Sequence, residues 1–236
     1  MRTNRSDQLR EYFSRLGLTY SGDRRNWRRS GADRLSGPYR GVHLNVFAER
    51  DSQLGDISES LHDPNIHSLY RHHLQVGVRI APAVTPAVCV IPRREYALVS
   101  KHGRPVVDGK VAAFGRDKYT VGNNLLYAKY VAVNRLLDTG VPEFDAEFGV
   151  ICPDEGYASR LLRPDLLSWF AQDKRSSGTR IGFMNEYVNV FFRTGVHLEP
   201  RELFTPEWIF PAADYLIDLL GKAPADVVRP AAVEPS

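Results

Sequence analysis

The sequence has little cysteine, no long apolar run and none of the short motifs that mark common catalytic sites. Only two cysteines occur in 236 residues, Cys89 and Cys152, and each lies in an apolar context. Such a pair excludes a disulfide framework, and both thiols are expected to be reduced and packed. The longest uncharged stretch, Ile80 to Pro92, has 13 residues and contains three prolines. A bilayer span needs about 20 apolar residues, so this stretch is expected to form core.

A secretory signal peptide is also missing, because residues 1–13 read MRTNRSDQLREYF and contain no continuous apolar segment. The chain is 43% hydrophobic and 25% charged, which is typical of a globular protein and excludes wholesale disorder. We therefore expect a cytoplasmic protein without a transmembrane segment.

Catalytic and cofactor motifs are absent as well. The sequence has no Gly-x-Ser-x-Gly elbow, no Gly-x4-Gly-Lys-Ser/Thr phosphate loop and no Gly-x-Gly-x-x-Gly turn. Both cysteines lie in strand-like apolar runs, where burial makes a thiol inert. These absences favour a non-catalytic chain with no cofactor.

Four of the seven histidines, His62, His67, His72 and His73, lie close together in the sequence. Their spacing is unfavourable for a metal site, because residues five apart on a helix point about 140° apart and neighbours on a strand face opposite sides. Glu59 and His62 are the only well-spaced carboxylate–imidazole pair. A metal-dependent enzyme using Glu59, His62, His67 and His72 is the alternative to a non-catalytic function.

The basic residues are concentrated at the N-terminus. Residues 1–40 hold ten arginines against four acidic residues, so the rest of the chain is slightly acidic although the whole is +3. The spacing of Leu9, Tyr12, Phe13 and Leu16 predicts a short amphipathic helix that begins at Ser6 and ends at Gly17. An arginine-rich segment around one tryptophan follows: Arg24, Arg25, Trp27, Arg28 and Arg29.

This N-terminal segment has three interpretations. Its helix could pack on the domain with a solvated basic loop beside it, or the segment could dock on an anionic membrane or a partner, because each basic residue near an anionic surface contributes about 1 kcal/mol. Nucleic acid, which also suits arginines interleaved with an aromatic residue, is the least favoured partner.

The remaining patterns predict an α+β fold, with a mainly antiparallel sheet built from hairpins and flanked by amphipathic helices. Strands are expected at 18–20, 42–47, 74–80, 87–91 and 147–152, and hairpins around 108–109 and 185–186. Helices are expected at 124–139, 154–162, 164–172 and from Pro206, whereas 21–37 is expected to be a loop. The predicted domains are a basic N-terminal unit (1–40), a single α+β domain (41–220) and a disordered tail (221–236).

A set of core and turn positions resembles uncharacterised actinobacterial proteins over residues 9–220. The matching residues are Leu16-Gly17-Leu18-x-Tyr20, Gly37-x-Tyr39-Arg40-Gly41-Val42, Pro142-Glu143-Phe144-Asp145-x-x-Phe148-x-Val150, Tyr157-Ala158, Leu161-Leu162-x-Pro164, Leu167, Trp169, Tyr187-Val188 and Gly195-x-x-Leu198-Glu199-Pro200. More faintly, the pattern is similar to the cytoplasmic domain of the mycobacterial trehalose monomycolate transport factor, a non-enzymatic accessory to a lipid exporter.

The resemblance implies a non-enzymatic accessory protein. Proteins of this type often carry a membrane helix ahead of the Gly-Leu-x-Tyr segment, and residues 1–16 here contain none. We therefore predict a protein-interaction domain whose partner is another protein, as part of a membrane-associated complex, with peripheral docking at the inner membrane surface. Its working parts would be Arg24, Arg25, Trp27, Arg28 and Arg29 together with the excursion from Asp51 to His73.

Overall fold

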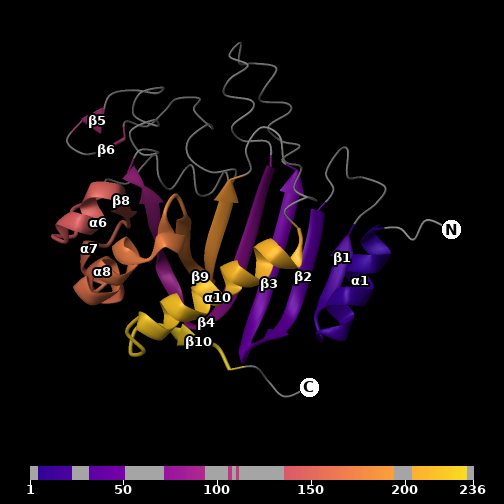
Figure 1. The fold of residues 1–236 in the computed structure, drawn as a ribbon. Coiled ribbons are helices and arrows are strands. Elements are labelled where there is room, and N and C mark those ends of the chain that lie inside the picture. The colour runs from indigo at the N-terminus through magenta and orange to yellow at the C-terminus, as the bar shows by residue number, and fades with distance from the viewer. Residues whose placement is uncertain are drawn as a thin grey trace, which may run out of the picture.

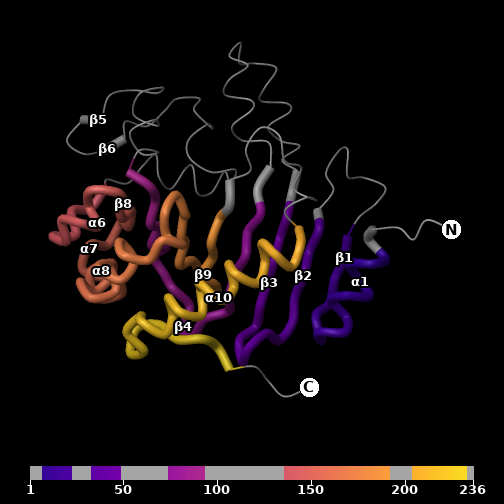
Figure 2. The backbone as a smooth tube through the Cα atoms, viewed as in Figure 1, coloured from indigo at the N-terminus to yellow at the C-terminus, as the bar shows by residue number. Residues whose placement is uncertain are grey.

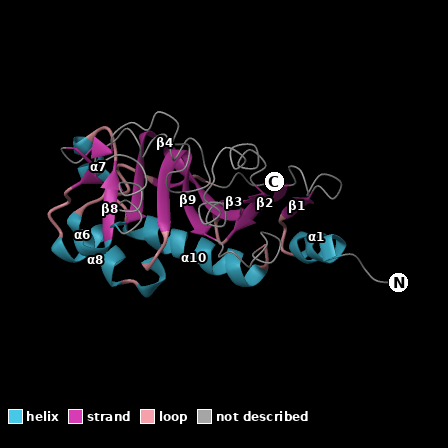
Figure 3. Cartoon of the chain, turned by 90° about the horizontal axis from the view of Figure 1, so that it is seen from above, coloured by secondary structure: helices cyan, strands magenta, loops and turns pink. Residues whose placement is uncertain are grey.

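The computed structural model describes residues 5–22, 32–50, 72–93, 106–107, 110–111, 136–193 and 204–232. Within these residues every strand pairing is antiparallel, and one sheet contains eight strands. Helices α1, α6, α8 and α10 lie on one side of that sheet (Figures 1 and 3). The predicted α+β class with a mainly antiparallel sheet is confirmed.

In chain order the elements are α1 (Arg5–Arg15), β1 (Thr19–Gly22), β2 (Ala32–Tyr39), β3 (Val42–Arg50), β4 (His72–Pro92), β5 (Val106–Val107), β6 (Lys110–Val111), β7 (Leu136–Leu137), α6 (Pro142–Glu147), β8 (Phe148–Ile151), α7 (Glu155–Leu161), α8 (Pro164–Gln172), η1 (Lys174–Ser176), β9 (Arg180–Arg193), α10 (Pro206–Lys222) and β10 (Arg229–Pro230).

Alternation of apolar and polar residues builds the middle of the sheet. Leu44 and Val46 of β3 lie opposite Val78 and Val76 of β4, and all four side chains are fully buried. Asn45, between Leu44 and Val46, and Gln75, next to Val76, are only half-buried. One face of the sheet therefore forms the core, as the period of two predicts.

Strand β4 is the central strand of the sheet, because it pairs with β3, β8, β9 and β10. Its 21 residues unite the two strands that the sequence predicts separately at 74–80 and 87–91. Figure 2 shows β4 bending strongly between these halves, where its register with β9 shifts twice, between Arg79 and Val84 and between Val84 and Val88. These irregularities turn one continuous strand into what looks like two in the sequence.

The predicted hairpin at Asn185–Glu186 is wrong. Both halves of β9 pair with β4, as Val190 does with Val76 and Ile181 with Val90. Asn185 has a φ of 54°, the left-handed conformation that also occurs in tight turns. Here it lies within one irregular strand instead of reversing the chain.

Helix α10 covers the core face of the sheet, contacting β3, β4 and β9 (Figure 1). Its buried residues include Ile209, Ala213, Leu216 and Leu220, which recur at three- and four-residue intervals along one face of the helix. The predicted start at Thr205-Pro206 is confirmed, with Thr205 as the N-cap and Pro211 inside the helix. α10 thus fixes the middle of the molecule.

Other local predictions are confirmed or corrected. Helix α1 ends before Gly17, whose φ of 75° is the predicted left-handed stop. Helices α7 and α8 match the predicted 154–162 and 164–172, and Val106 pairs with Val111 as the hairpin around 108–109 requires. The helix predicted from Asn124 lies outside the described residues except at its end, where Leu136–Leu137 form strand β7 instead.

Two regions expected to be irregular are ordered in part. The expected loop at 21–37 includes most of β2. This strand pairs with β3 through the turn at Arg40 and Gly41, so residues on both sides of the predicted domain boundary share one sheet. Within the expected disordered tail, Arg229 pairs with Ala81 of β4 and Val228 is fully buried.

In the part of the chain that the structure describes, no helix is long and apolar enough to cross a membrane.

Candidate interaction surface

The N-terminal edge of the sheet, defined here as α1, β1 and β2, is held by one aromatic side chain. Phe13 of α1 is fully buried, and its ring centre lies 6.2 Å from those of Tyr20 and Phe204 and 6.3 Å from that of Phe210. Two of these rings come from the α10 region, so Phe13 fixes α1 against the core.

The apolar positions of α1 are only partly used in this packing. Leu9 is half-buried, whereas Tyr12 and Leu16 remain 44% and 48% exposed. Arg10 and Arg15 accompany them on the helix and pair with Asp7 and Glu11 one turn away. Such exposed pairs contribute little to stability, so both guanidinium groups stay at the surface. α1 therefore presents apolar and basic side chains that the core does not require.

A buried hydrogen bond joins the next two strands of this edge. The Tyr20 hydroxyl donates to Asp33 Oδ1 at 2.7 Å, and Asp33 is 6% exposed. This contact explains why β2 is compatible with the sheet although its sequence is polar. The predicted binding residues Arg24, Arg25, Trp27, Arg28 and Arg29 follow β1 directly but lie outside the described residues.

The strand registers place several chain segments at a common end of the sheet. Gly22 lies opposite Asp33, Ala32 opposite Glu49, Arg50 opposite His72, and His73 opposite Arg193. The residues that precede and follow 23–31 and 51–71 are therefore neighbours in one row of strand ends. The two predicted working parts of the chain start and finish at this row.

Of the four predicted metal ligands, only His72 lies within the described residues. Glu59, His62 and His67 lie outside the described residues, and His72 is the first residue of β4. Across the described ranges, no group of three or more His, Cys, Asp or Glu side chains could hold a metal ion. The alternative of a metal-dependent enzyme has no support in these residues.

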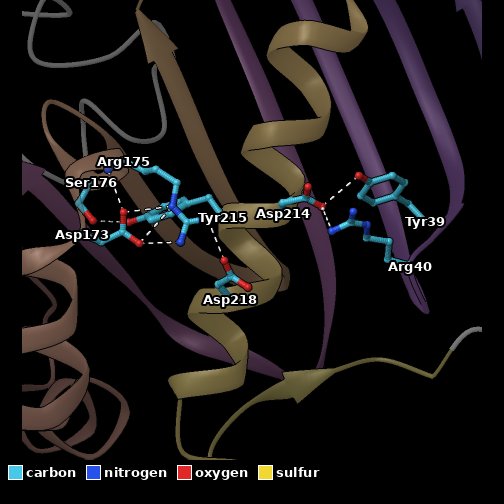
Figure 4. Close-up of polar contacts among 8 residues, drawn as sticks. All are labelled: Tyr39, Arg40, Asp173, Arg175, Ser176, Asp214, Tyr215 and Asp218. Carbon is cyan, nitrogen blue, oxygen red and sulfur yellow. Dashed lines mark hydrogen bonds and ion pairs between the residues drawn. The ribbon is translucent and has the colours of Figure 1, made fainter.

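Asp214 of α10 connects the helix to the β2–β3 turn (Figure 4). It accepts a hydrogen bond from the Tyr39 hydroxyl at 3.0 Å and pairs with Arg40 at 3.0 Å. Burial of the phenol, followed by the hydrogen bond to Asp214, raises the pKa of Tyr39. Tyr39 also stacks on Phe210 with ring centres 4.9 Å apart, so the turn is fixed by polar and apolar contacts together.

A second polar network fixes the other half of α10 (Figure 4). Arg175 donates to Asp173 and, at 2.8 Å, to Asp218, and its guanidinium lies 5.2 Å from the Tyr215 ring centre. The hydrogen bonds from Arg175 lower the pKa of Asp173. Burial raises the pKa of Tyr215 to about 12, while its hydroxyl lies 2.8 Å from Ser176 Oγ. A tyrosine kept protonated in this way is not a base at neutral pH, and the network fastens η1 to α10.

Both cysteines are free and buried, as predicted. Burial raises the pKa of the Cys89 thiol well above its usual range, so it is not a nucleophile in the folded protein.

The opposite edge of the sheet, formed by β7, β8 and helices α6 to α8, is acidic. Residues 136–173 hold eight acidic residues against two arginines. Asp145 accepts hydrogen bonds from the Thr139 amide and hydroxyl, and Glu143 accepts one from Ser168. Some of these carboxylates thus have local structural roles. In the sequence alone they are indistinguishable from solvated surface carboxylates.

A pocket of about 110 Å³ opens at this acidic edge between β7 and α7. It is smaller than the roughly 300 Å³ at which small-molecule sites begin, so a single side chain suits it better than a cofactor. Its apolar lining comes from Leu137, Val150, Ala158, Leu162 and Pro164, and its polar lining from Asp138, Thr139, Glu155 and Ser159. The sequence does not predict this pocket, because its walls come from four separate segments.

Comparison of the chain with protein-family models, with curated proteins and with solved structures finds no match. The resemblance to uncharacterised actinobacterial proteins therefore stays a prediction.

Proposed function

We propose that this chain is a non-catalytic protein-interaction domain, an accessory component of a membrane-associated complex, which docks at the inner membrane surface through its N-terminal edge. The observation that carries the proposal is the exposure of Tyr12 on α1 and of Leu16 directly after it, although Phe13 already fixes this helix to the core. Apolar side chains on a surface helix bearing arginines are typical of segments that lie at a membrane interface.

The charge beside this helix supports the same proposal. Four arginines and one tryptophan occupy positions 24–29, directly after β1. Near an anionic surface each arginine contributes about 1 kcal/mol, and tryptophan favours the boundary between headgroups and acyl chains. Attraction by the arginines and insertion of Tyr12 and Leu16 would act together on one edge of the molecule.

The network geometry supports a binding role over catalysis. The tyrosines and carboxylates around α10 are engaged with one another and fasten secondary structure (Figure 4). They fasten α10 to Tyr39 of β2 and to η1.

Flotation with liposomes tests the proposal. The full chain is expected to float with vesicles of phosphatidylglycerol and to remain behind with neutral phosphatidylcholine. Replacing Arg24, Arg25, Arg28 and Arg29 with Glu should abolish flotation, and Tyr12→Ser with Leu16→Ser should weaken it while leaving the fold intact.

The matched control compares two arginines at each edge. R24E/R25E and R160E/R163E change the net charge equally, but only the first pair lies in the N-terminal segment. Equal loss of flotation in both variants, or none in either, would contradict the proposal. If only a protein partner is lost from pull-downs while liposome binding never occurs, the membrane part of the proposal is wrong.

A further inference from the structure

We propose that Arg40, in the turn between β2 and β3, binds the phosphate group of an anionic phospholipid when α1 lies on a membrane. The inference rests on the proposed function and adds to it a described residue that is remote in the sequence from the helix. It also gives a role to the motif Gly37-x-Tyr39-Arg40-Gly41-Val42, which the proposed function does not otherwise use.

The other residues of this motif have structural roles. Gly37 has a φ of 146°, and a Cβ there would lie 3.0 Å from the Gly17 carbonyl oxygen. Tyr39 stacks on a ring of α10, and Val42 is buried in the core. Gly41, with a φ of 81°, completes the turn. The arginine is thus the residue of the motif whose side chain the hairpin itself does not require.

Arg40 adopts a backbone conformation that is unfavourable for arginine. The pairing of Tyr39 with Val42 leaves Arg40 and Gly41 as a two-residue turn, and the φ of Arg40 is 47°. Asparagine and glycine favour this left-handed conformation at the first turn position, whereas for arginine it is strained. A strained residue at an exposed position points to a role of its side chain in binding.

A series of aromatic contacts places Arg40 beside α1. The Phe13 ring centre lies 6.3 Å from that of Phe210, and Phe210 stacks on Tyr39 with ring centres 4.9 Å apart. The Arg40 guanidinium in turn lies 5.7 Å from the Tyr39 ring centre. Helices α1 and α10 lie on the same side of the sheet (Figure 3). The cation is therefore a neighbour of the helix whose exposed apolar side chains would enter the membrane.

The guanidinium of Arg40 is accessible although it has a partner. The side chain is 65% exposed and pairs with Asp214 at 3.0 Å through Nη1 (Figure 4). Asp214 also accepts a hydrogen bond from the Tyr39 hydroxyl. Because a guanidinium has five N–H groups, Arg40 can donate to a phosphate while Asp214 holds it in place.

An anionic phospholipid fits this combination of side chains. Arginine forms charge-assisted hydrogen bonds with phosphate oxygens, and the exposed Tyr12 and Leu16 suit the boundary between headgroups and acyl chains. A soluble phosphate ester would use the arginine but leave the apolar side chains in water.

Flotation of the full chain with phosphatidylglycerol vesicles measures the contribution of Arg40. Arg40→Asn introduces a residue that favours the turn, so the melting temperature should stay close to that of the wild type. Vesicle binding should fall about fivefold, the effect of one arginine near an anionic surface. Arg40→Lys should retain most of the binding. Arg163→Asn is the matched control, because it removes an exposed, ion-paired arginine of the acidic edge and should leave binding unchanged.

Asp214→Asn separates lipid binding from a structural role of Arg40. It removes the ion pair but keeps an oxygen that can accept from Tyr39, so vesicle binding should be at least that of the wild type. Equal losses in Arg40→Asn and Asp214→Asn would mean that the ion pair acts through the fold, which overturns the inference. Wild-type flotation that Arg40→Asn leaves unchanged overturns the inference alone. A wild-type chain that does not float overturns the proposed function as well.

Discussion

The two edges of the sheet are closed by the same kind of packing but carry opposite charge. At the N-terminal edge Phe13 packs among Tyr20, Phe204 and Phe210, and at the acidic edge Phe144, Phe148 and Phe170 form a triad with ring centres 4.8 to 5.7 Å apart. Aromatic clusters therefore pack helices against the sheet at both edges. This packing does not involve the difference in charge between the edges. We therefore expect the charges to matter for what each edge binds.

The largest effect should come from removing the aromatic anchor of the N-terminal edge. Phe13→Ala is expected to lower the free energy of unfolding by about 3–5 kcal/mol, because it leaves a cavity among three rings. Leu16→Ala, one residue after the end of α1, should change it by less than about 0.5 kcal/mol, since Leu16 is 48% exposed. Urea denaturation followed by circular dichroism measures both. Equal effects would mean that α1 does not pack as described.

A smaller effect should follow from disconnecting the acidic edge from α10. Tyr215→Phe removes the hydroxyl that lies 2.8 Å from Ser176 Oγ and leaves that buried serine without this partner. The expected loss is about 1–2 kcal/mol in the free energy of unfolding. Tyr157→Phe on α7 is the control and should be close to neutral, because Tyr157 is only half-buried. A neutral Tyr215→Phe would show that ring packing and the contact between Arg175 and Asp218 fasten η1 to α10 without this hydroxyl.

The helix cap at the acidic edge provides a finer comparison. Asp154 is the N-cap of α7 and accepts from the Tyr157 amide at 2.8 Å. Asp154→Ala should cost about 1 kcal/mol, whereas Asp154→Asn should retain most of the stability, because asparagine also caps helices. Thermal unfolding of the two variants measures this difference. If both lose the same amount, the carboxylate charge matters more than the hydrogen bond.

The smallest effect concerns pH. The pKa of Asp173 is lowered in the folded protein from a usual value of 3.8, chiefly by the hydrogen bonds from Arg175. The unfolded chain therefore binds more protons at acidic pH, so the stabilisation is complete above pH 3.8 and is lost as pH falls through the lowered pKa of Asp173. Asp173→Asn should flatten the acid side of the stability curve. An unchanged curve would show that the ion pair does not persist in solution.

Local signals predicted much of the fold, and non-local pairing accounts for the errors. Asp154 as a cap, Pro164 at a helix start and Gly17 at a helix end each act within a few residues, and α7, α8 and α1 lie where the sequence predicts them. The nature of β9 depends on its partner β4, about a hundred residues away, so the turn-like Asn185-Glu186 was misleading. Strand β2 looks like a loop in the sequence because it is polar, and a partner of its buried Asp33, the Tyr20 hydroxyl, lies 13 residues away in the sequence.

For the candidate surfaces, too, local features could be predicted from the sequence and non-local contacts could not. The spacing of Leu9, Tyr12, Phe13 and Leu16 predicted the amphipathic helix, but which of the four remain exposed depends on where Phe204 and Phe210 lie. The acidic pocket could not be predicted, because its lining residues are brought together only when β7, β8, α7 and the start of α8 pack.

The position of β4 also has a consequence for how the chain folds. In the finished sheet His73 lies opposite Arg193, and Ile80 lies opposite Pro230. Contacts between residues so far apart in the sequence have to close long loops before they contribute any stability, which slows folding relative to helical proteins of similar size. We expect refolding on the timescale of milliseconds to seconds or slower, with the β4–β9 pairing formed late and the helices formed early.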